Sequence, residues 1–196
     1  MNYLAHAYLS FGNPDVLVGN MVSDYVKGKK KFDYPQGIQR GMEIHRAIDN
    51  YTDSHKIIKE AKQYFQNPYR LYSGAFIDVV FDHFLATDKN EFPNDSSLLL
   101  FSKTVYDVLA GSFTLLPLPF QKMFPYMQKQ NWLYNYQFDW GIQKSLEGLR
   151  HRAQYIAETE SAFAIFNTDY SALKKLYAAF FPQLKAFCKS ELNITD

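Results

Sequence analysis

Residues 77–85 read Ile-Asp-Val-Val-Phe-Asp-His-Phe-Leu, within a segment, 67–86, that begins at an Asn-Pro pair. If this segment is a helix, it is apolar on nearly every side, and its polar exceptions are Asp78, Asp82 and His83. A helix that is hydrophobic all round is normally buried. The segment therefore predicts a central helix at the core of the fold.

Helical signals also occupy most of the chain on either side of this segment. Asn13-Pro14 fits a helix start and Gly28 a helix stop, while residues 52–54 can cap the helix that follows them. Asn131 and Asp139 are further candidate caps. Besides 67–86, we expect helices over residues 3–11, 14–27, 36–51, 55–65, 96–110, 139–154 and 170–190. Prolines 117, 119 and 125 predict a loop with a short helical insert.

No segment alternates polar and apolar residues as a half-buried strand does, and no internal repeat is present. We therefore expect an all-α helical bundle that forms one domain over residues 1–196. The formal net charge is only +1, which gives no reason to expect binding to nucleic acid or membranes. Cys188 is the only cysteine, so a soluble protein of the reducing cytoplasm is the simplest expectation.

Histidines and carboxylates recur at helical spacing in two places. His45, Asp49 and Asp53 are four residues apart, as are Asp78 and Asp82, so each set lines one helix face. Carboxylates beside histidines, set among apolar residues, suit a divalent cation that activates a water molecule. The spacing thus predicts a metal site.

Helix geometry restricts which of these residues share one ion. His45 and Asp53 would lie about 12 Å apart along a helix axis, so only one of them can be a ligand of a given ion. His45 with Asp49 can share an ion, as can Asp78 with Asp82. His83 points about 100° away from Asp82 and is either a ligand from another side or a partner of one.

Asp24 follows Leu17 and Met21 on a helix face that we expect to turn inward. A buried carboxylate must be protonated, hydrogen-bonded, paired or bound to metal. Simpler roles exist for several of these residues. Asp53 fits a helix cap equally well, Asp49 can pair with Arg46, and His6 alone could be an ordinary core residue.

Together these motifs resemble the acyl carrier protein phosphodiesterase family, divergent relatives of the HD-domain phosphohydrolases. The resemblance rests on Met1–His6, Gly19–Gly28, Gly41 with His45–Asp49 and Thr52-Asp53, Asp78 with Phe81–Leu85, and more loosely Asn131–Leu133 and Phe181-Pro182. HD proteins are named for an adjacent His-Asp pair, whereas this chain has Asp82-His83 in the reverse order.

The resemblance implies an HD-like helical fold and removal of the 4'-phosphopantetheine arm from holo acyl carrier protein, with Mn²⁺ as the expected metal and Mg²⁺ as an alternative. It implies a metal set of Asp24, His45, Asp49, Asp78 and Asp82, with His6, Arg46 and His83 nearby. We expect a metal-activated water as nucleophile, with Asp82 or a neighbouring acid accepting its proton. Arg46 or a lysine would neutralise the phosphate, and His83 or His6 would protonate the leaving serine oxygen.

An acidic carrier protein would need a positive surface beside the site, and an exposed loop with Lys27, Lys29, Lys30 and Lys31 follows Asp24 directly. Ordinary solubility is the simpler reading of such a run. Two other functions stay open: a phosphohydrolase acting on a nucleotide or other small phosphodiester, and a non-catalytic helical binding protein whose acids form structural ion pairs.

Overall fold

The computed structural model describes residues 1–153 and 156–194, and the protein is all-α over these residues, with no strand among them. This confirms the predicted fold class. The α-helices are α1 (Tyr3–Tyr8), α2 (Pro14–Val22), α3 (Gln36–Ser54), α4 (Lys56–Tyr69), α5 (Ser73–Thr87), α6 (Asp95–Gly111), α7 (Leu118–Lys129), α8 (Trp132–Asn135), α9 (Asp139–Arg152), α10 (Glu160–Thr168) and α11 (Tyr170–Glu191). Short 3₁₀ helices are η1 (Ser23–Tyr25), η2 (Gly28–Asp33), η3 (Arg70–Tyr72) and η4 (Phe113–Leu115).

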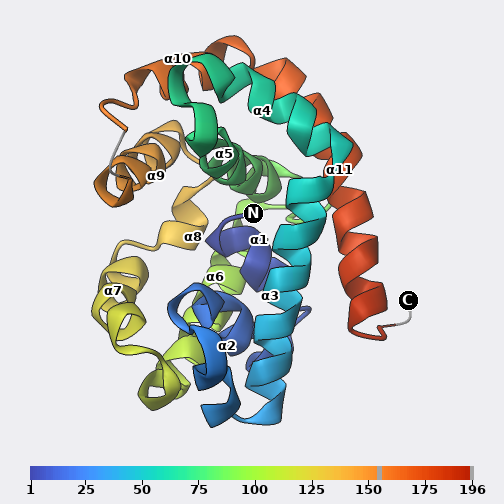
Figure 1. The fold of residues 1–196 in the computed structure, drawn as a ribbon, viewed down its shortest axis with the longest axis vertical. Helices are drawn as coiled ribbons and strands as arrows, with labels where there is room; N and C mark the ends of the chain where they lie inside the picture. Colours follow the sequence, from blue (N-terminus) through green and yellow to red (C-terminus); the bar gives the residue numbers. More distant parts are fainter. Residues whose placement is uncertain (154–155, 195–196) are drawn as a thin grey trace.

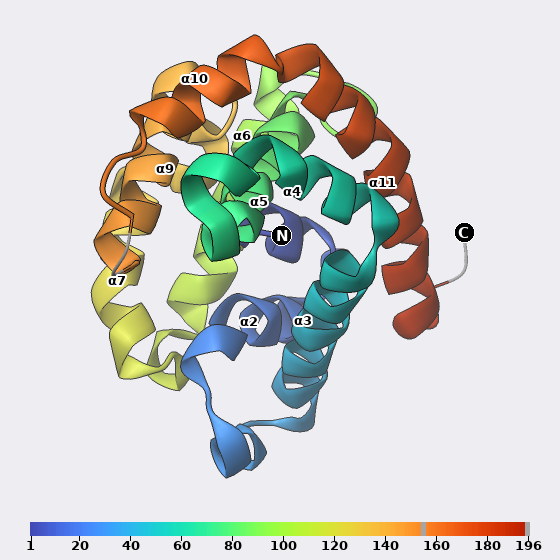
Figure 2. The same cartoon turned by 45° about the horizontal axis from the view of Figure 1, so that its top comes forward.

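Helix α5 is the central element that the sequence predicts. Helices α1, α4, α9 and α11 all pack against it, and Figures 1 and 2 show it enclosed by its neighbours. Its Phe76, Phe81 and Phe84 side chains are fully or almost fully buried. Removing several large aromatic side chains from water is a major favourable contribution to folding. The core thus forms around the stretch with the most continuous apolar pattern.

Helices α2 and α3 lie side by side in both views and are in very close contact (Figures 1 and 2). The contact passes through two glycines, Gly19 and Gly41. A Cβ atom added at Gly41 would lie 2.3 Å from the carbonyl oxygen of Val16, and one at Gly19 would lie 2.0 Å from that of Ile38. Only glycine fits at such distances, so these two positions allow the backbones of the two helices to approach each other.

Several predicted helix ends are wrong. The helix predicted for 14–27 ends at Val22 and tightens into η1, and the helix predicted to end at Tyr51 continues to Ser54. Residues 52–54 therefore do not cap α4. His55 does, because its Nδ1 accepts a hydrogen bond from the backbone of Ile57.

Two predictions based on proline positions are wrong. Pro68 does not start a helix but lies in the last turn of α4, which ends one residue later at Tyr69. Pro117 and Pro119 flank the first residue of α7, where prolines are well tolerated, so a full helix replaces the expected loop.

The remaining differences lie in the C-terminal half. Neither Asn131 nor Asp139 caps a helix through its side chain. Helix α10 lies in a segment to which the sequence analysis assigns no element. Helix α9 ends at Arg152, and its expected end at Gln154 lies outside the described residues. Within the described part of the chain, no helix combines the length and apolarity that crossing a membrane requires.

Candidate metal centre

Two buried histidines from different helices stack on each other at the centre of the candidate site. The ring of His6, from α1, lies parallel to the ring of His45, from α3, with 4.0 Å between centroids and 17° between planes. Both residues are about 95% buried. Their Nδ1 and Nε2 atoms therefore have few possible partners besides the surrounding protein groups.

Asn20 of α2 fixes the orientation of both rings. Its Nδ2 donates hydrogen bonds to the His6 carbonyl oxygen and to Ser10 Oγ, which places Oδ1 against His6 Nδ1 at 2.8 Å. The carbonyl oxygen of Asn20 lies 2.7 Å from His45 Nδ1. Both Nδ1 atoms face acceptor oxygens and must carry hydrogen, so both Nε2 atoms are the ones directed at the carboxylates.

Asp49 and Asp24 supply these carboxylates. Asp49, one turn after His45, has one oxygen 3.1 Å from His45 Nε2 and the other 3.3 Å from His6 Nε2. Asp24, in η1, has Oδ1 3.1 Å from His45 Nε2. The expected pairing of His45 with Asp49 is present, and Asp24 reaches His45 because α2 and α3 are in such close contact.

Mutual charge compensation sets the titration behaviour of the cluster. Burial lowers the pKa of His45, but hydrogen bonds to Asp24 and Asp49 outweigh it and raise that pKa to about 9. Burial opposes ionisation of Asp49, yet His45 and His6 hold its pKa well below the ordinary value. Burial and the nearby His45 lower the pKa of His6. The carboxylates are therefore ionised and His45 carries a proton.

This donor set fits a divalent cation. One ligand atom from each of His6, His45 and Asp49 lies within 4.8 Å of the others, and Asp24 contacts the same His45 nitrogen. Two imidazole nitrogens whose other nitrogen is hydrogen-bonded, together with carboxylate oxygens, are an ordinary site for Mn²⁺, Fe²⁺ or Zn²⁺. A bound cation would replace the proton that now lies between His45 and its carboxylates.

Asp24 differs from the sequence-based expectation in one respect. It was expected to point into the core, but its side chain is 76% exposed. The helix ends at Val22, so the periodicity that placed Asp24 on the inward face no longer applies there. This exposure leaves Asp24 open to solvent on the side away from His45.

Asp78 and Asp82 have other partners. The N-terminal ammonium of Met1 lies 2.9 Å from Asp78 Oδ1. Asp82 is fully buried and accepts hydrogen bonds from the backbone N–H groups of Asn2, Leu4 and Ala5, at the start of α1. Neither aspartate belongs to the group of close ligand atoms around His6.

His83 and Arg46 are the other two residues expected near the metal set. His83 Nδ1 lies 2.8 Å from the carbonyl oxygen of Tyr136 and its Nε2 3.2 Å from the Tyr170 hydroxyl, and the ring is buried among aromatic side chains. Arg46 follows His45 on the solvent side of α3 and is exposed. Asp53 lies in the last turn of α3 and pairs with Lys62 at 2.9 Å.

The lysine segment is exposed, as expected, but it is not a loop. Residues Gly28–Asp33 form η2, and Lys27, Lys29 and Lys30 are exposed. Lys31 is partly buried because its ammonium group lies over the ring of Phe32, 4.9 Å from the centroid. The segment begins three residues after Asp24.

Asn20 and Thr52 occur in the motifs quoted from the sequence, but no role at the metal site is predicted for them. Asn20 is fully buried in a helix otherwise lined by apolar residues, and a buried amide needs hydrogen-bond partners. A single amide among the buried apolar residues of this helix was the sequence feature that could have indicated its role. Thr52 lies one turn after Asp49 on the same face of α3, and its buried hydroxyl has no hydrogen-bond partner among the described residues.

A cavity of about 320 Å³ adjoins the cluster, and Asp24 lies on one side of it and Asp78 on another. Met1, Asn2 and the apolar residues Ala75 and Ile156 complete much of its wall. The cavity thus meets the ligand cluster at Asp24, and its wall contains two acidic residues, Asp24 and Asp78.

The chain is similar in sequence to known proteins of one family. The family model described as acyl carrier protein phosphodiesterase matches residues 1–184. Proteins named acyl carrier protein phosphodiesterase from Yersinia pestis and Yersinia enterocolitica are 30% and 31% identical to this chain, over 94% of it and 95% of their own lengths. A protein of the same name from Pectobacterium atrosepticum is 28% identical over 97% of this chain and 99% of its own.

No solved structure matches the chain, so the expected likeness to the HD-domain fold stays a prediction. The family match covers His6, Asp24, His45 and Asp49 together, and it is continuous through α5 and α9. The chain belongs to the acyl carrier protein phosphodiesterase family, a family of phosphodiester hydrolases.

Proposed function

We propose that this protein removes 4'-phosphopantetheine from holo acyl carrier protein in the cytoplasm, and that it uses a divalent cation, with Mn²⁺ as the first candidate. The observation that carries the proposal is the group of His6, His45, Asp49 and Asp24 beside an open cavity. The names of the related proteins supply the substrate.

His6, His45, Asp49 and Asp24 would hold the cation. When bound, it would supply Lewis acidity, which lowers the pKa of water toward about 7 and polarises a phosphoryl oxygen. Asn20 keeps both imidazole Nε2 atoms directed at this point by holding both Nδ1 atoms. The predicted roles of Asp78 and Asp82 as ligands remain predictions, since their present contacts are with the N-terminal ammonium and the backbone of α1.

Hydrolysis adds water to phosphorus and breaks its bond to the serine oxygen of the carrier protein, which leaves with a proton. Arg46, exposed beside His45, is the side chain we assign to the negative charge that develops on phosphate. We assign the proton of water to an acidic group in the cavity wall, Asp24 or Asp78. The role predicted for His83 in proton transfer is tested by a variant described below, and the roles predicted for Asp82 and His6 stay predictions.

Carrier docking is assigned to the lysine segment. Lys27, just before η2, and Lys29 and Lys30, within it, are exposed, and Phe32, 62% exposed, is an apolar side chain of the same segment. Positive charges of this kind speed the encounter with an acidic partner. Changing Lys27, Lys29, Lys30 and Lys31 to Ser should therefore raise KM more than it lowers kcat. Added salt should weaken binding of the carrier protein to the wild type more than to this variant. Equal salt dependence would contradict docking here.

Mass spectrometry of holo acyl carrier protein tests the reaction. Incubation with the protein and Mn²⁺ should convert the carrier to its apo form and release 4'-phosphopantetheine, and a chelator should stop the conversion. Cleavage of nucleotides or other small phosphodiesters with an intact carrier protein would favour the alternative phosphohydrolase. Neither activity, together with no metal bound by elemental analysis, would favour a non-catalytic binding protein.

A further inference from the structure

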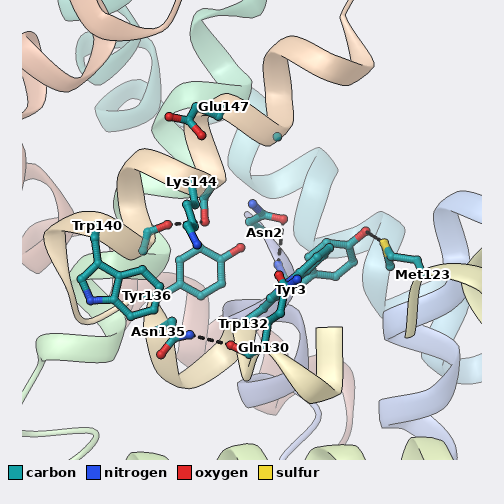
Figure 3. A pocket seen from close by; sticks show the side chains of 13 residues that line it. Asn2, Tyr3, Met123, Gln130, Trp132, Asn135, Tyr136, Trp140, Lys144 and Glu147 are labelled. Carbon is teal, nitrogen blue, oxygen red and sulfur yellow. Dashed lines mark hydrogen bonds between the residues drawn. The ribbon is translucent and has the colours of Figure 1, made fainter. Parts of the chain in front are cut away.

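A second and larger cavity, of about 610 Å³, lies between the start of α1 and the helices α7, α8 and α9. Figure 3 shows its labelled side chains running from Trp140 at one end, past Tyr136 and Asn2, to Tyr3 and Met123 at the other. Its volume is in the range of ordinary small-molecule sites.

The lining of this cavity combines aromatic rings with amide side chains. Both tryptophans of the chain, Trp132 and Trp140, belong to it. Asn2, Gln130 and Asn135 each use one end of the amide group within the protein: Asn2 Oδ1 accepts from the Tyr3 backbone, Gln130 Oε1 accepts from Trp132 Nε1, and Asn135 Nδ2 donates to the Gln130 carbonyl oxygen.

The other end of each of these three amides makes no hydrogen bond among the described residues. Two amide N–H donors and one amide oxygen acceptor therefore lie along an aromatic wall. A ligand that combines amide groups with short apolar segments satisfies such a wall, whereas a plain hydrocarbon chain would cover the amides without hydrogen-bonding them.

The cavity adjoins the candidate metal centre at its Asn2 and Tyr3 end. Asn2 lines both this cavity and the smaller one that contains Asp24 and Asp78. His6 follows Tyr3 by three residues on α1, about one helical turn. The Tyr3 hydroxyl also lies 2.9 Å from that of Tyr25, the residue after Asp24.

We propose that this cavity binds the pantetheine arm of the carrier protein, with the phosphate end at Asn2 and the thiol end toward Trp140. This proposal rests on the proposed function. The arm is an uncharged chain of two amides, a gem-dimethyl group and a thiol, so its amides match Asn2, Gln130 and Asn135 and its apolar parts match the aromatic rings. A phosphate placed between the two cavities would then lie beside the candidate ligands.

Tryptophan emission provides a direct test, because both reporters lie in the cavity. Free pantetheine, without phosphate, carrier protein or metal, should change the emission of the wild-type protein saturably. Gly148 lines the cavity in α9, and a Cβ atom added there meets nothing within 4 Å. Gly148→Phe should fill the cavity and weaken pantetheine binding about tenfold or more.

Gly111→Phe is the matched control. A Cβ atom added at Gly111, the last residue of α6, also meets nothing within 4 Å, and Gly111 does not line the cavity. It should bind pantetheine like the wild type. With holo carrier protein, Gly148→Phe should raise KM about tenfold and leave metal binding unchanged. Circular dichroism and thermal unfolding of both variants establish that the fold is intact.

Three results would overturn the assignment: no saturable response to pantetheine, an equal response in Gly148→Phe, or a response to a fatty acid but not to pantetheine. The last would make the cavity a site for an acyl chain. Because binding of pantetheine needs no turnover, its failure is distinct from failure of the proposed reaction. Pantetheine binding without hydrolysis of the carrier protein would keep the cavity assignment and remove the proposed function.

Discussion

The protein buries histidine beside carboxylate in two regions, and the two regions satisfy these groups differently. In the first, His6, His45 and Asp49 face one another through side-chain atoms, and His45 and Asp49 compensate each other's charge. In the second, Asp82 receives three backbone N–H groups of α1, and His83 lies against the Tyr136 carbonyl oxygen and the Tyr170 hydroxyl.

This difference separates a binding site from a structural one. Backbone and hydroxyl partners saturate Asp82 and His83, so a ligand would have to displace contacts that hold α1 and α8 in place. In the first region, one ligand atom from each of His6, His45 and Asp49 lies within 4.8 Å of the others, so these side chains can bind one cation together. Burial of a charged residue is the same signal in both regions, and only the identity of its partners distinguishes them.

The largest expected effect compares His45→Gln with His83→Gln. We expect His45→Gln to lose divalent metal and to lower turnover of holo carrier protein about a thousandfold, because a ligand to the cation is gone. His83→Gln should keep its metal and most of its turnover, and should lose about 1–3 kcal/mol of stability instead, since an amide replaces a packed, hydrogen-bonded imidazole. Steady-state kinetics, elemental analysis and urea unfolding measure these quantities.

Either of two outcomes would erase the distinction. If His83→Gln lost turnover as severely as His45→Gln while remaining folded, the role in proton transfer predicted for His83 from the sequence would be restored. If His45→Gln retained metal and activity, the first region would be structural as well.

A smaller effect is expected from Asn20, which touches both histidines without facing the candidate metal position. Asn20→Leu keeps the approximate volume but removes the acceptor that fixes His6 Nδ1. Loss of such an orienting partner usually lowers metal affinity about 10- to 100-fold. Isothermal titration with Mn²⁺ measures it, and Asn20→Asp, which keeps an acceptor at Oδ1, is the matched variant. An unchanged affinity in Asn20→Leu would show that stacking alone orients the rings.

How far the sequence predicts this arrangement depends on how local each part is. The central helix and the pair His45 and Asp49 follow from periodicity within one helix, and both are present. The contact of His45 with Asp24 requires α2 and α3 to meet at Gly19 and Gly41, and helix spacing contains no information about that contact.

Asp82 illustrates what a single sequence cannot supply. The pattern correctly indicates that this carboxylate is buried. Its partners, however, are backbone N–H groups that are far away in sequence, such as that of Leu4. Every residue except proline has a backbone N–H group, so the sequence does not show which ones bind Asp82. The helix ends fail for a related reason. Ser23–Tyr25 and Pro68 follow tertiary packing rather than local propensity.

The remaining prediction uses pH to compare the two regions. Burial raises the pKa of Asp82 from 3.8 to about 7, although backbone N–H groups of α1 oppose the shift. Between pH 4 and 7 the native carboxyl then holds a proton that the unfolded chain has lost, so this group makes the protein less stable as pH rises, by up to about 1.4 kcal/mol per pH unit. Asp49 has the opposite sign: its lowered pKa contributes stability above pH 4 that is lost as pH falls further.

Urea unfolding of the wild type and of Asp82→Asn at several pH values measures the free energy of unfolding of each protein. From pH 4 to 7 the variant should gain stability relative to the wild type, so the two plots of unfolding free energy against pH should converge or cross. Parallel curves would show that the three backbone hydrogen bonds keep Asp82 ionised throughout this range, and the second region would then be a charged cap of α1 rather than a protonated one.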